Sequence, residues 1–325
     1  MCTAIHLIKN GHYFGRNLDL EYHYNEAITV TPRNFDFKFK APFLNNERYA
    51  IIGMATTVDG YPLYYDACNE AGLAMAGLNF PGCAQYQPID SKKDNTASFE
   101  FIPWILSTCR TVKEARALLQ NTNVCSDAFS PELPPSPLHW MISDAETSIV
   151  VEPLQDGLRI FDNPLGVMTN GPSFDYHLMR LRDFTGLSPD MPENTFIPAL
   201  DLAPYSRGMG TMGLPGDWSS VSRFIRAAYL RAHSSCAKNE ASSIAQFFRI
   251  LGAVSHVRGS VRVKDRYEIT QYTSCCCTEK GLYFYTTYEN QNLTAVDLHR
   301  ENLDSEEFIE YPMMKQPEAF IQNRR

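Results

Sequence analysis

No stretch of the sequence approaches the roughly 18 uninterrupted apolar residues that a membrane-spanning helix requires. Polar residues, among them His6, Lys9 and His12, interrupt the start of the chain, where a secretory signal would need an apolar segment of about 7–15 residues. Basic residues are not in excess either, because the formal net charge is −8. We therefore expect a cytoplasmic protein without a secretory signal, a membrane span or general affinity for nucleic acid.

The nine cysteines include no C-x-x-C pair, so the spacings of zinc ribbons and thioredoxins are missing. Cys275, Cys276 and Cys277 form a run in a segment typical of a strand, where neighbouring side chains point to opposite faces. Small buried thiols are the favoured interpretation of this run, and a redox or metal protein built on it is an alternative. The sequence also lacks internal repeats, a G-x-G-x-x-G motif and a P-loop.

The chain does carry enough apolar residues for a large core, with 44% hydrophobic side chains among 325 residues. Apolar or alternating runs near both ends, such as 27–31, 50–57 and 268–277, predict strands, and helical patterns are grouped between them. Two segments are typical of loops: residues 33–48 and the Gly- and Pro-rich residues 185–217. This order indicates an α+β fold of antiparallel sheets covered by helices.

The first nineteen residues form the most informative stretch of the chain. Residues 2–8 alternate in the manner of a strand, and Asn10-Gly11 is a strong signal for a hairpin with a two-residue type I′ turn. That turn would place Cys2 opposite Asp19, with their Cβ atoms about 4.5–5.5 Å apart. The local sequence therefore predicts a carboxylate beside the second residue.

Removal of Met1 would leave Cys2 with a free α-amino group, whose reference pKa of about 7.7–8.0 suits a base near neutral pH. A terminal amine that serves as base for the nucleophile of its own residue is an accepted catalytic arrangement, and Asp19 would orient that amine. The alternative is an ordinary strand cysteine in an edge hairpin. A papain-like cysteine–histidine pair has no supporting motif, and we interpret His139 and His177 as structural.

Six motifs then occur in order along the chain: MCTAIHL, FGRNLDLEY, AGLNFPG, GVMTNGPSFDYH, GLPGDWSSVSRFIR and QYTSC. Together they resemble the choloylglycine hydrolases, the family of bile salt hydrolases and penicillin V acylases, from Met1 to about Leu303. The resemblance implies an N-terminal-nucleophile hydrolase fold, which is a four-layer αββα sandwich of two antiparallel sheets. It also implies a bacterial enzyme with a single domain over residues 1–325.

The resemblance implies a role for each matching residue. Cys2 would be the nucleophile, Arg16 would lie against its thiol and favour the thiolate, and Asp19 would hold the α-amino group. Asn170 would donate its side-chain amide, and Asn79 a backbone N–H, to the oxyanion of the tetrahedral intermediate.

Arg223, in SRFIR, matches the arginine that stabilises charge developing in the transition state. Each match also has a structural alternative. Asn170 could belong to an ordinary turn and Asn79 to a strand end, while Arg223 and Arg16 could be solvated surface charges. Their joint occurrence in one order favours the active site.

The predicted hairpin conflicts with the role of Arg16. Arg16 and Asp19 have opposite parity along the strand, so with Cys2 opposite Asp19 only Asp19 would share a face with the thiol. We therefore predict a bulge or turn near Arg16-Asn17, since bulges re-aim side chains beside active sites.

Asn79 also bears on the substrate, because the resemblance associates asparagine here with bile salt hydrolases and tyrosine with penicillin V acylases. The expected substrate is a glycine- or taurine-conjugated bile salt. Penicillin V hydrolysis, or non-catalytic binding of a bile salt or lipid, is the alternative. The resemblance implies no metal or organic cofactor. It aligns residues 185–217 with an assembly arm, so a homotetramer is expected. We expect these residues to line an apolar substrate cleft: Leu18, Tyr24, Val58, Tyr65, Phe129 and Leu138.

Overall fold

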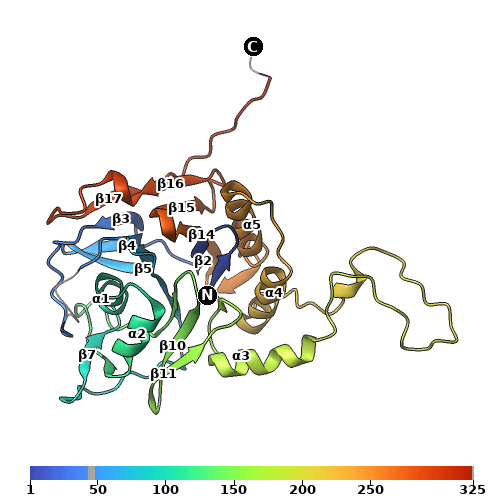
Figure 1. The fold of residues 1–325 in the computed structure, drawn as a ribbon, viewed down its shortest axis with the longest axis horizontal. Helices are drawn as coiled ribbons and strands as arrows, with labels where there is room; N and C mark the ends of the chain where they lie inside the picture. The colour runs from blue at the N-terminus through green and yellow to red at the C-terminus, as the bar shows by residue number, and fades with distance from the viewer. Residues whose placement is uncertain (43–47, 324–325) are drawn as a thin grey trace.

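The computed structural model describes residues 1–42 and 48–323, so part of the loop expected over 33–48 lies outside the described residues. Two large sheets stack face to face, and helices cover the outer side of each sheet (Figure 1). All pairings within the two large sheets are antiparallel. The α+β sandwich expected from the sequence is therefore confirmed.

The sheet that contains the amino terminus has seven strands in the order β12-β1-β2-β14-β15-β16, with β13 paired to β14. It joins the first hairpin to the last third of the chain, so residues far apart in sequence meet around β1 and β2. Its strands are β1 Cys2–Ile8, β2 His12–Leu20, β12 Val167–Met168, β13 Val261–Val263, β14 Arg266–Cys277, β15 Leu282–Thr287 and β16 Thr294–Asp297.

The second sheet has eight strands in the order β11-β10-β9-β6-β5-β4-β3-β17. A separate parallel pair, β7 Asp94–Ala97 with β8 Thr122–Cys125, lies outside both sheets. The strands of the second sheet are β3 Ala27–Thr31, β4 Ile51–Val58, β5 Tyr61–Asn69, β6 Ala74–Asn79, β9 Leu138–Ser143, β10 Ser148–Leu154, β11 Gly157–Asp162 and β17 Ile309–Pro312.

Two helix pairs form the outer layers of the sandwich. A capping interaction begins the second helix, where the Thr111 hydroxyl accepts from the Glu114 backbone N–H at 3.2 Å. The Glu114 carboxylate reaches back to the backbone N–H of Arg110 at 2.7 Å. The helices are α1 Phe101–Thr108, α2 Val112–Leu119, α3 Phe174–Arg180, α4 Ser220–Ala232 and α5 Glu240–Gly252, with short 3₁₀ turns η1 Leu181–Phe184, η2 Met209–Thr211, η3 Thr278–Lys280 and η4 Leu298–Arg300.

Side-chain alternation in the strands builds two hydrophobic cores. On β4, Ile52 and Met54 point between the sheets, whereas Ile51 and Ala55 join the core under α1 and α2. A sheet buried on both faces needs apolar residues at successive positions, which explains why this run in the sequence does not alternate with polar residues.

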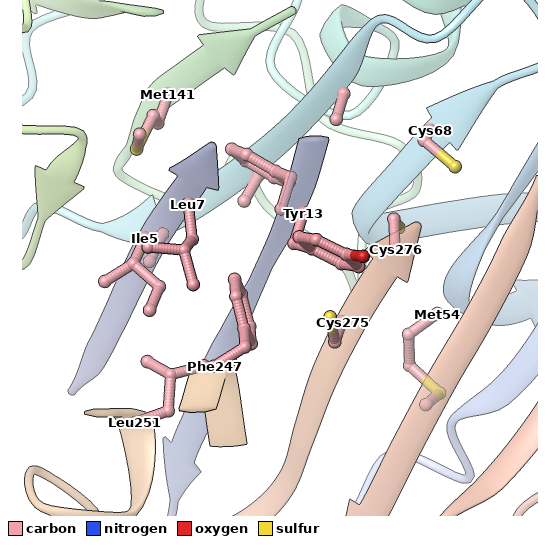
Figure 2. Close-up of a cluster of buried hydrophobic side chains, with 14 of the residues drawn as sticks. Ile5, Leu7, Tyr13, Met54, Cys68, Met141, Phe247, Leu251, Cys275 and Cys276 are labelled. Atoms are coloured by element: carbon pink, nitrogen blue, oxygen red, sulfur yellow. The ribbon is translucent and has the colours of Figure 1, made fainter. Parts of the chain in front are cut away.

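The first sheet is covered by α4 and α5 on its outer face. Figure 2 shows Ile5 and Leu7 of β1 with Phe247 and Leu251 of α5, all of which are buried in one cluster. Full burial of such a side chain contributes about 1.5–3 kcal/mol. The amino-terminal strand is therefore fixed from its helix side, and its other face meets the second sheet.

The segment 185–217 extends away from the body between η1 and α4 as a long arm, drawn in yellow (Figure 1). Its largest apolar side chains point into solvent, since Phe196 is 85% and Tyr205 is 84% exposed. Among the described residues, no helix is both long and apolar enough to cross a bilayer.

Candidate functional site

The register of the first hairpin differs by one residue from the prediction. Cys2 lies opposite Leu18, and Ile8 lies opposite His12. The loop therefore has three residues, because Lys9 joins Asn10 and Gly11, both of which have positive φ. The predicted pairing of Cys2 with Asp19 is wrong, and Asp19 instead exchanges backbone hydrogen bonds with Met1 at 2.7 and 2.9 Å.

This shift places Arg16, rather than Asp19, on the face of the sheet that carries the thiol. Arg16 Nη2 lies 2.5 Å from Cys2 Sγ, and its Nη1 donates to the carbonyl oxygens of Gly77 and Tyr65 at 2.5 and 3.2 Å. Arg16 thus lies between the two sheets. The expected contact between Arg16 and the thiol is present without any distortion of β2.

Burial and charge act in opposite directions on Arg16. Burial lowers the pKa of the Arg16 guanidinium, but its proximity to Cys2, and then to Tyr272 and Asp66, outweighs that effect and raises its pKa. A fully buried cation of this kind stabilises an anion in contact with it.

Asp19 and Asn17 point to the opposite, helix-facing side of β2. Asn17 Nδ2 donates to Leu251 of α5 at 2.9 Å, and Asp19 Oδ1 accepts from the Thr270 hydroxyl at 2.6 Å. The predicted bulge near Arg16-Asn17 is wrong, because pairing between β1 and β2 is regular from Cys2 to Ile8. The irregularity lies on the facing strand, where β14 shifts register between Thr270 and Tyr272.

Asn170 and Arg223 converge on Cys2 from the chain after β12 and from α4. Asn170 Oδ1 accepts from the Cys2 backbone N–H at 2.8 Å and from Arg223 Nη2 at 2.7 Å. Arg223 Nη1 also donates to the Cys2 carbonyl oxygen at 2.5 Å and to the Thr3 hydroxyl at 2.7 Å. Burial lowers the pKa of Arg223, although Asp19 and Cys2 oppose this shift.

Asn79 is brought to the same place by the end of β6. The Asn170 Nδ2 group donates to the Asn79 carbonyl oxygen at 2.7 Å. A primary amide has two N–H hydrogens, so this bond uses one of them and orients the other. All six predicted catalytic residues are therefore gathered around Cys2, with Asn79 contributing through its backbone.

The segment that carries Asn170 is held by His139 and His177, the two histidines interpreted as structural from the sequence. His139 Nε2 lies 2.9 Å from the Thr169 carbonyl oxygen, and His177 Nε2 lies 2.9 Å from that of Asn170. Glu152 is buried, lies 3.1 Å from His139 Nδ1 and accepts from the Phe174 backbone N–H at the start of α3. The backbone carbonyls of Thr169 and Asn170 are thus both fixed by buried histidines.

Sequence reasoning missed a buried carboxylate, Asp66 of β5, which lies near Arg16. It accepts hydrogen bonds from the hydroxyls of Tyr272, Ser274 and Tyr283 at 2.6–2.8 Å. Burial raises the pKa of Asp66, while Arg16 and the three hydroxyls act to lower it. An aspartate inside the apolar run of β5 was the available signal, since buried charges need partners.

The residues predicted to line a substrate cleft fall into two groups. Leu18 pairs with Cys2, Leu138 pairs with Asn79, and the Tyr65 carbonyl accepts from Arg16, so these three adjoin the catalytic residues. Tyr24 is linked to Tyr65 because its carbonyl and the Tyr65 hydroxyl both lie 2.9 Å from the Thr56 hydroxyl.

The other two predicted cleft residues meet at Tyr61. Val58 pairs with Tyr61 across the turn between β4 and β5, and the ring of Phe129 packs against that of Tyr61. A role for any of the six in substrate binding stays a prediction.

The cysteine run divides between the two faces of β14. Cys276 lies beside Cys68 between the sheets, whereas Cys275 and Cys277 point to the helix side (Figure 2). Burial raises the pKa of Cys275 and Cys276 well above the ordinary value and that of Cys277 to about 11. These are protonated core thiols, which do not favour metal binding or redox chemistry.

Comparison with known families agrees with this geometry. The family model described as linear amide C–N hydrolases, choloylglycine hydrolase family, matches residues 2–311. The chain is 47% identical to a bile salt hydrolase/transferase from Lactiplantibacillus plantarum, with 99% of this chain and all of the relative covered. It is 42% identical to a bile salt hydrolase/transferase from Clostridium perfringens, with 97% and 98% covered.

Solved structures give the same picture. A conjugated bile acid hydrolase variant from Clostridium perfringens superposes with a TM-score of 0.90 at 40% identity, covering 99% of this chain and all of that one. A penicillin V acylase from Agrobacterium tumefaciens has a TM-score of 0.73 at 22% identity, covering 94% and 89%, and so shares the fold.

Proposed function

Because the chain belongs to the choloylglycine hydrolase family of linear amide C–N hydrolases, we propose that it hydrolyses glycine- or taurine-conjugated bile salts. It is a hydrolase of amide C–N bonds, and the proposal concerns its substrate and mechanism. Relatives with 36–47% identity over nearly the full length carry bile salt or conjugated bile acid hydrolase in their names, which supports this choice.

In the proposed first step, Met1 has been removed and the Cys2 thiolate attacks the amide carbonyl carbon. The C–S bond forms while the carbonyl π electrons move to oxygen, where the Asn170 Nδ2 group and the Asn79 backbone N–H stabilise the negative charge. Arg16 supports the thiolate at 2.5 Å before attack, which is the observation that carries the proposal. Arg223 stabilises the tetrahedral intermediate through its bond to Asn170.

Collapse of the intermediate breaks the C–N bond and leaves a thioester on Cys2. The α-ammonium group of Cys2 gives its proton to the departing nitrogen, so glycine or taurine leaves as a neutral amine. The same α-amino group then takes a proton from water, whose oxygen attacks the thioester carbon. The C–S bond breaks, the bile acid is released and Cys2 returns to the thiolate. Asp19 holds the amine during both transfers.

Release of glycine and taurine from conjugated bile salts, measured together with the intact mass, tests this proposal. We expect a mass without Met1, turnover of both conjugate classes, and no turnover by Cys2→Ala. Full activity in a preparation that retains Met1 would overturn the terminal-amine mechanism. Penicillin V in a parallel assay tests the alternative substrate, and binding of a bile salt without turnover would identify a non-catalytic binder.

A further part of the proposal is that the enzyme is a cytoplasmic bacterial homotetramer, and the arm over residues 185–217 supports the assembly. Its exposed apolar side chains, Phe196 and Tyr205 among them, are suited to burial against another subunit. Light scattering at micromolar concentration would give a tetrameric mass, and a monodisperse monomer would contradict this assignment.

A further inference from the structure

A cluster of buried polar groups lies behind Asp19, on the side remote from the thiol. Within residues 1–42 and 48–323, Asp19 Oδ2, both ring nitrogens of His256 and Glu268 Oε1 are buried without a hydrogen bond of good geometry. They face one another, since His256 Nε2 lies 3.7 Å from Asp19 Oδ2 and His256 Nδ1 lies 3.0 Å from Glu268 Oε1. Orphaned buried groups in such numbers indicate a site that serves a function.

The unprocessed amino terminus occupies one side of this cluster. The Met1 ammonium lies 2.9 Å from Glu268 Oε1 and 2.7 Å from the Asp19 carbonyl oxygen. The nitrogen of Cys2 is one residue along the chain, at most about 3.6 Å from that of Met1. The α-amino group created at Cys2 therefore lies near the Glu268 carboxylate and beside the backbone of Asp19.

Removal of Met1 moves the terminal amino group from its contact with Glu268 to the nitrogen of Cys2. A carboxylate only accepts hydrogen bonds, so Asp19 and Glu268 still need a donor between them. His256 is in that position, with one ring nitrogen turned toward each carboxylate. Before processing, burial raises the pKa of Glu268, but His256 and the terminal ammonium outweigh burial and lower it.

Thr270 fixes the distance between His256 and Asp19. Its hydroxyl accepts from the His256 backbone N–H at 2.7 Å and donates to Asp19 Oδ1 at 2.6 Å. Thr270 lies directly opposite Asp19 in the pairing of β14 with β2, so the two side chains share the helix-facing side of the sheet. His256 and Thr270 also line a groove of about 1070 Å³ between α5 and the β14–β15 strands.

We propose that His256 and Glu268 are positioning residues that act through Asp19 and set the protonation of the Cys2 α-amino group. This inference rests on the proposed function. The charged groups that face the amine are Asp19 on β2, Glu268 on β14, His256 before β13 and Arg223 on α4. Arg16 lies on the other side of β2 and acts on the thiol.

The two substitutions are expected to shift the pH profile in opposite directions. Glu268→Gln removes an anion near the α-ammonium group, so the acid limb of kcat/KM moves to lower pH by about one unit. His256→Gln leaves two carboxylates without their shared partner, which favours the ammonium form and moves the acid limb upward. The matched control is Glu289→Gln, which breaks an exposed pair with Arg258 and leaves the profile in place.

The experiment measures kcat/KM on glycine-conjugated bile salt from pH 4 to 8, after intact mass has shown that each variant lacks Met1. Alkylation of Cys2 by iodoacetamide over the same pH range, followed on the Cys2 peptide, gives a readout that needs no substrate. Opposite shifts in the two variants support the inference. Profiles that superpose on that of the wild type, or that shift in the same direction, overturn it.

The two assays separate this inference from the proposed function. A wild-type enzyme that does not cleave bile salts contradicts the function, while the alkylation profiles still test the roles of His256 and Glu268. If His256→Gln does not fold, Glu268→Gln carries the test, because its expected shift has its own sign. A purely structural role would lower the Tm and leave both profiles unchanged.

Discussion

Arg16 and Asp19 point to opposite faces of β2, and Arg16 contacts the Cys2 thiol whereas Asp19 pairs with Met1 through its backbone. Arg16 contacts Sγ from between the sheets, whereas Asp19 lies on the helix side with the amino terminus. When a nucleophile uses its own amine as base, the thiol must face the substrate while the amine is held on the opposite face of the sheet. A regular strand provides it, since successive side chains alternate between faces.

Removal of the Arg16 charge should slow the reactions of the Cys2 thiolate. In Arg16→Met the aliphatic volume is kept and the buried cation is lost, so Cys2 alkylation at pH 7 falls by about tenfold or more. The rate is measured with iodoacetamide on the Cys2 peptide. Arg258→Met, which removes an exposed arginine, is the control. Equal rates in the two variants would show that Arg16 does not activate the thiol.

The hairpin shows both the reach and the limit of the sequence. Asn10-Gly11 correctly indicated the turn, because both residues adopt positive φ. The dipeptide does not reveal whether a third residue joins the loop, and the inclusion of Lys9 moved every pairing by one. A shift of one residue exchanges the two faces of a strand, so the predicted register puts Arg16 and Asp19 on the wrong faces of β2.

The same loop yields a stability prediction. Gly11 has φ of +135°, which an L-residue rarely adopts, so Gly11→Ala should destabilise the protein by about 1–3 kcal/mol. Urea unfolding measures the difference. Gly186→Ala is the matched control, because open space surrounds that position and its backbone is unstrained. Equal stability of the two variants would mean that the loop tolerates a side chain at Gly11.

Two buried histidines should make the fold sensitive to acid. His6 Nδ1 and His12 Nε2 both lie within 2.9 Å of the Ser143 hydroxyl, and burial lowers their pKa values to about 3 and about 4. The unfolded chain binds these protons near pH 6.5, so the free energy of unfolding falls as the pH decreases from about 6.5 toward 4. Each histidine contributes up to about 1.4 kcal/mol per pH unit.

Urea unfolding at pH 7, 6 and 5 tests this dependence. His12→Gln should flatten the decline in stability, since it removes one of the groups that gain a proton on unfolding. His299→Gln changes an exposed histidine and should leave the slope unaltered. A slope in His12→Gln as steep as that of the wild type would contradict the assignment.

The arm predicts how the subunits assemble. Phe196→Ser combined with Tyr205→Ser removes the two most exposed large apolar side chains of the arm, and the mass measured by light scattering should fall below that of a tetramer. Phe320→Ser is the control, because it changes a side chain that is 92% exposed near the carboxyl terminus, outside the arm, and should keep the wild-type mass. An unchanged mass in the double variant would place the interface elsewhere.

The residues that sequence reasoning missed are those that act through other residues. Cys2, Asn170 and Arg223 lie in motifs that resemble a family, so they could be identified one by one. Asp66, His256 and Glu268 have partners more than 200 residues away along the chain, and only folding brings each residue to its partner. Glu268 was visible only as a charge beginning an apolar strand, which does not specify a partner.

The half-buried amino terminus has a practical consequence for anyone who produces this protein. Every residue placed before Cys2 would have to fit where the Met1 ammonium meets Glu268, and would keep the Cys2 nitrogen in an amide bond. Under the proposed mechanism, an affinity tag or fluorescent fusion at that end would inactivate the enzyme until a protease released Cys2. The chain after β17 leads away from the body (Figure 1). A tag at the carboxyl terminus would therefore not interfere with the removal of Met1 from Cys2.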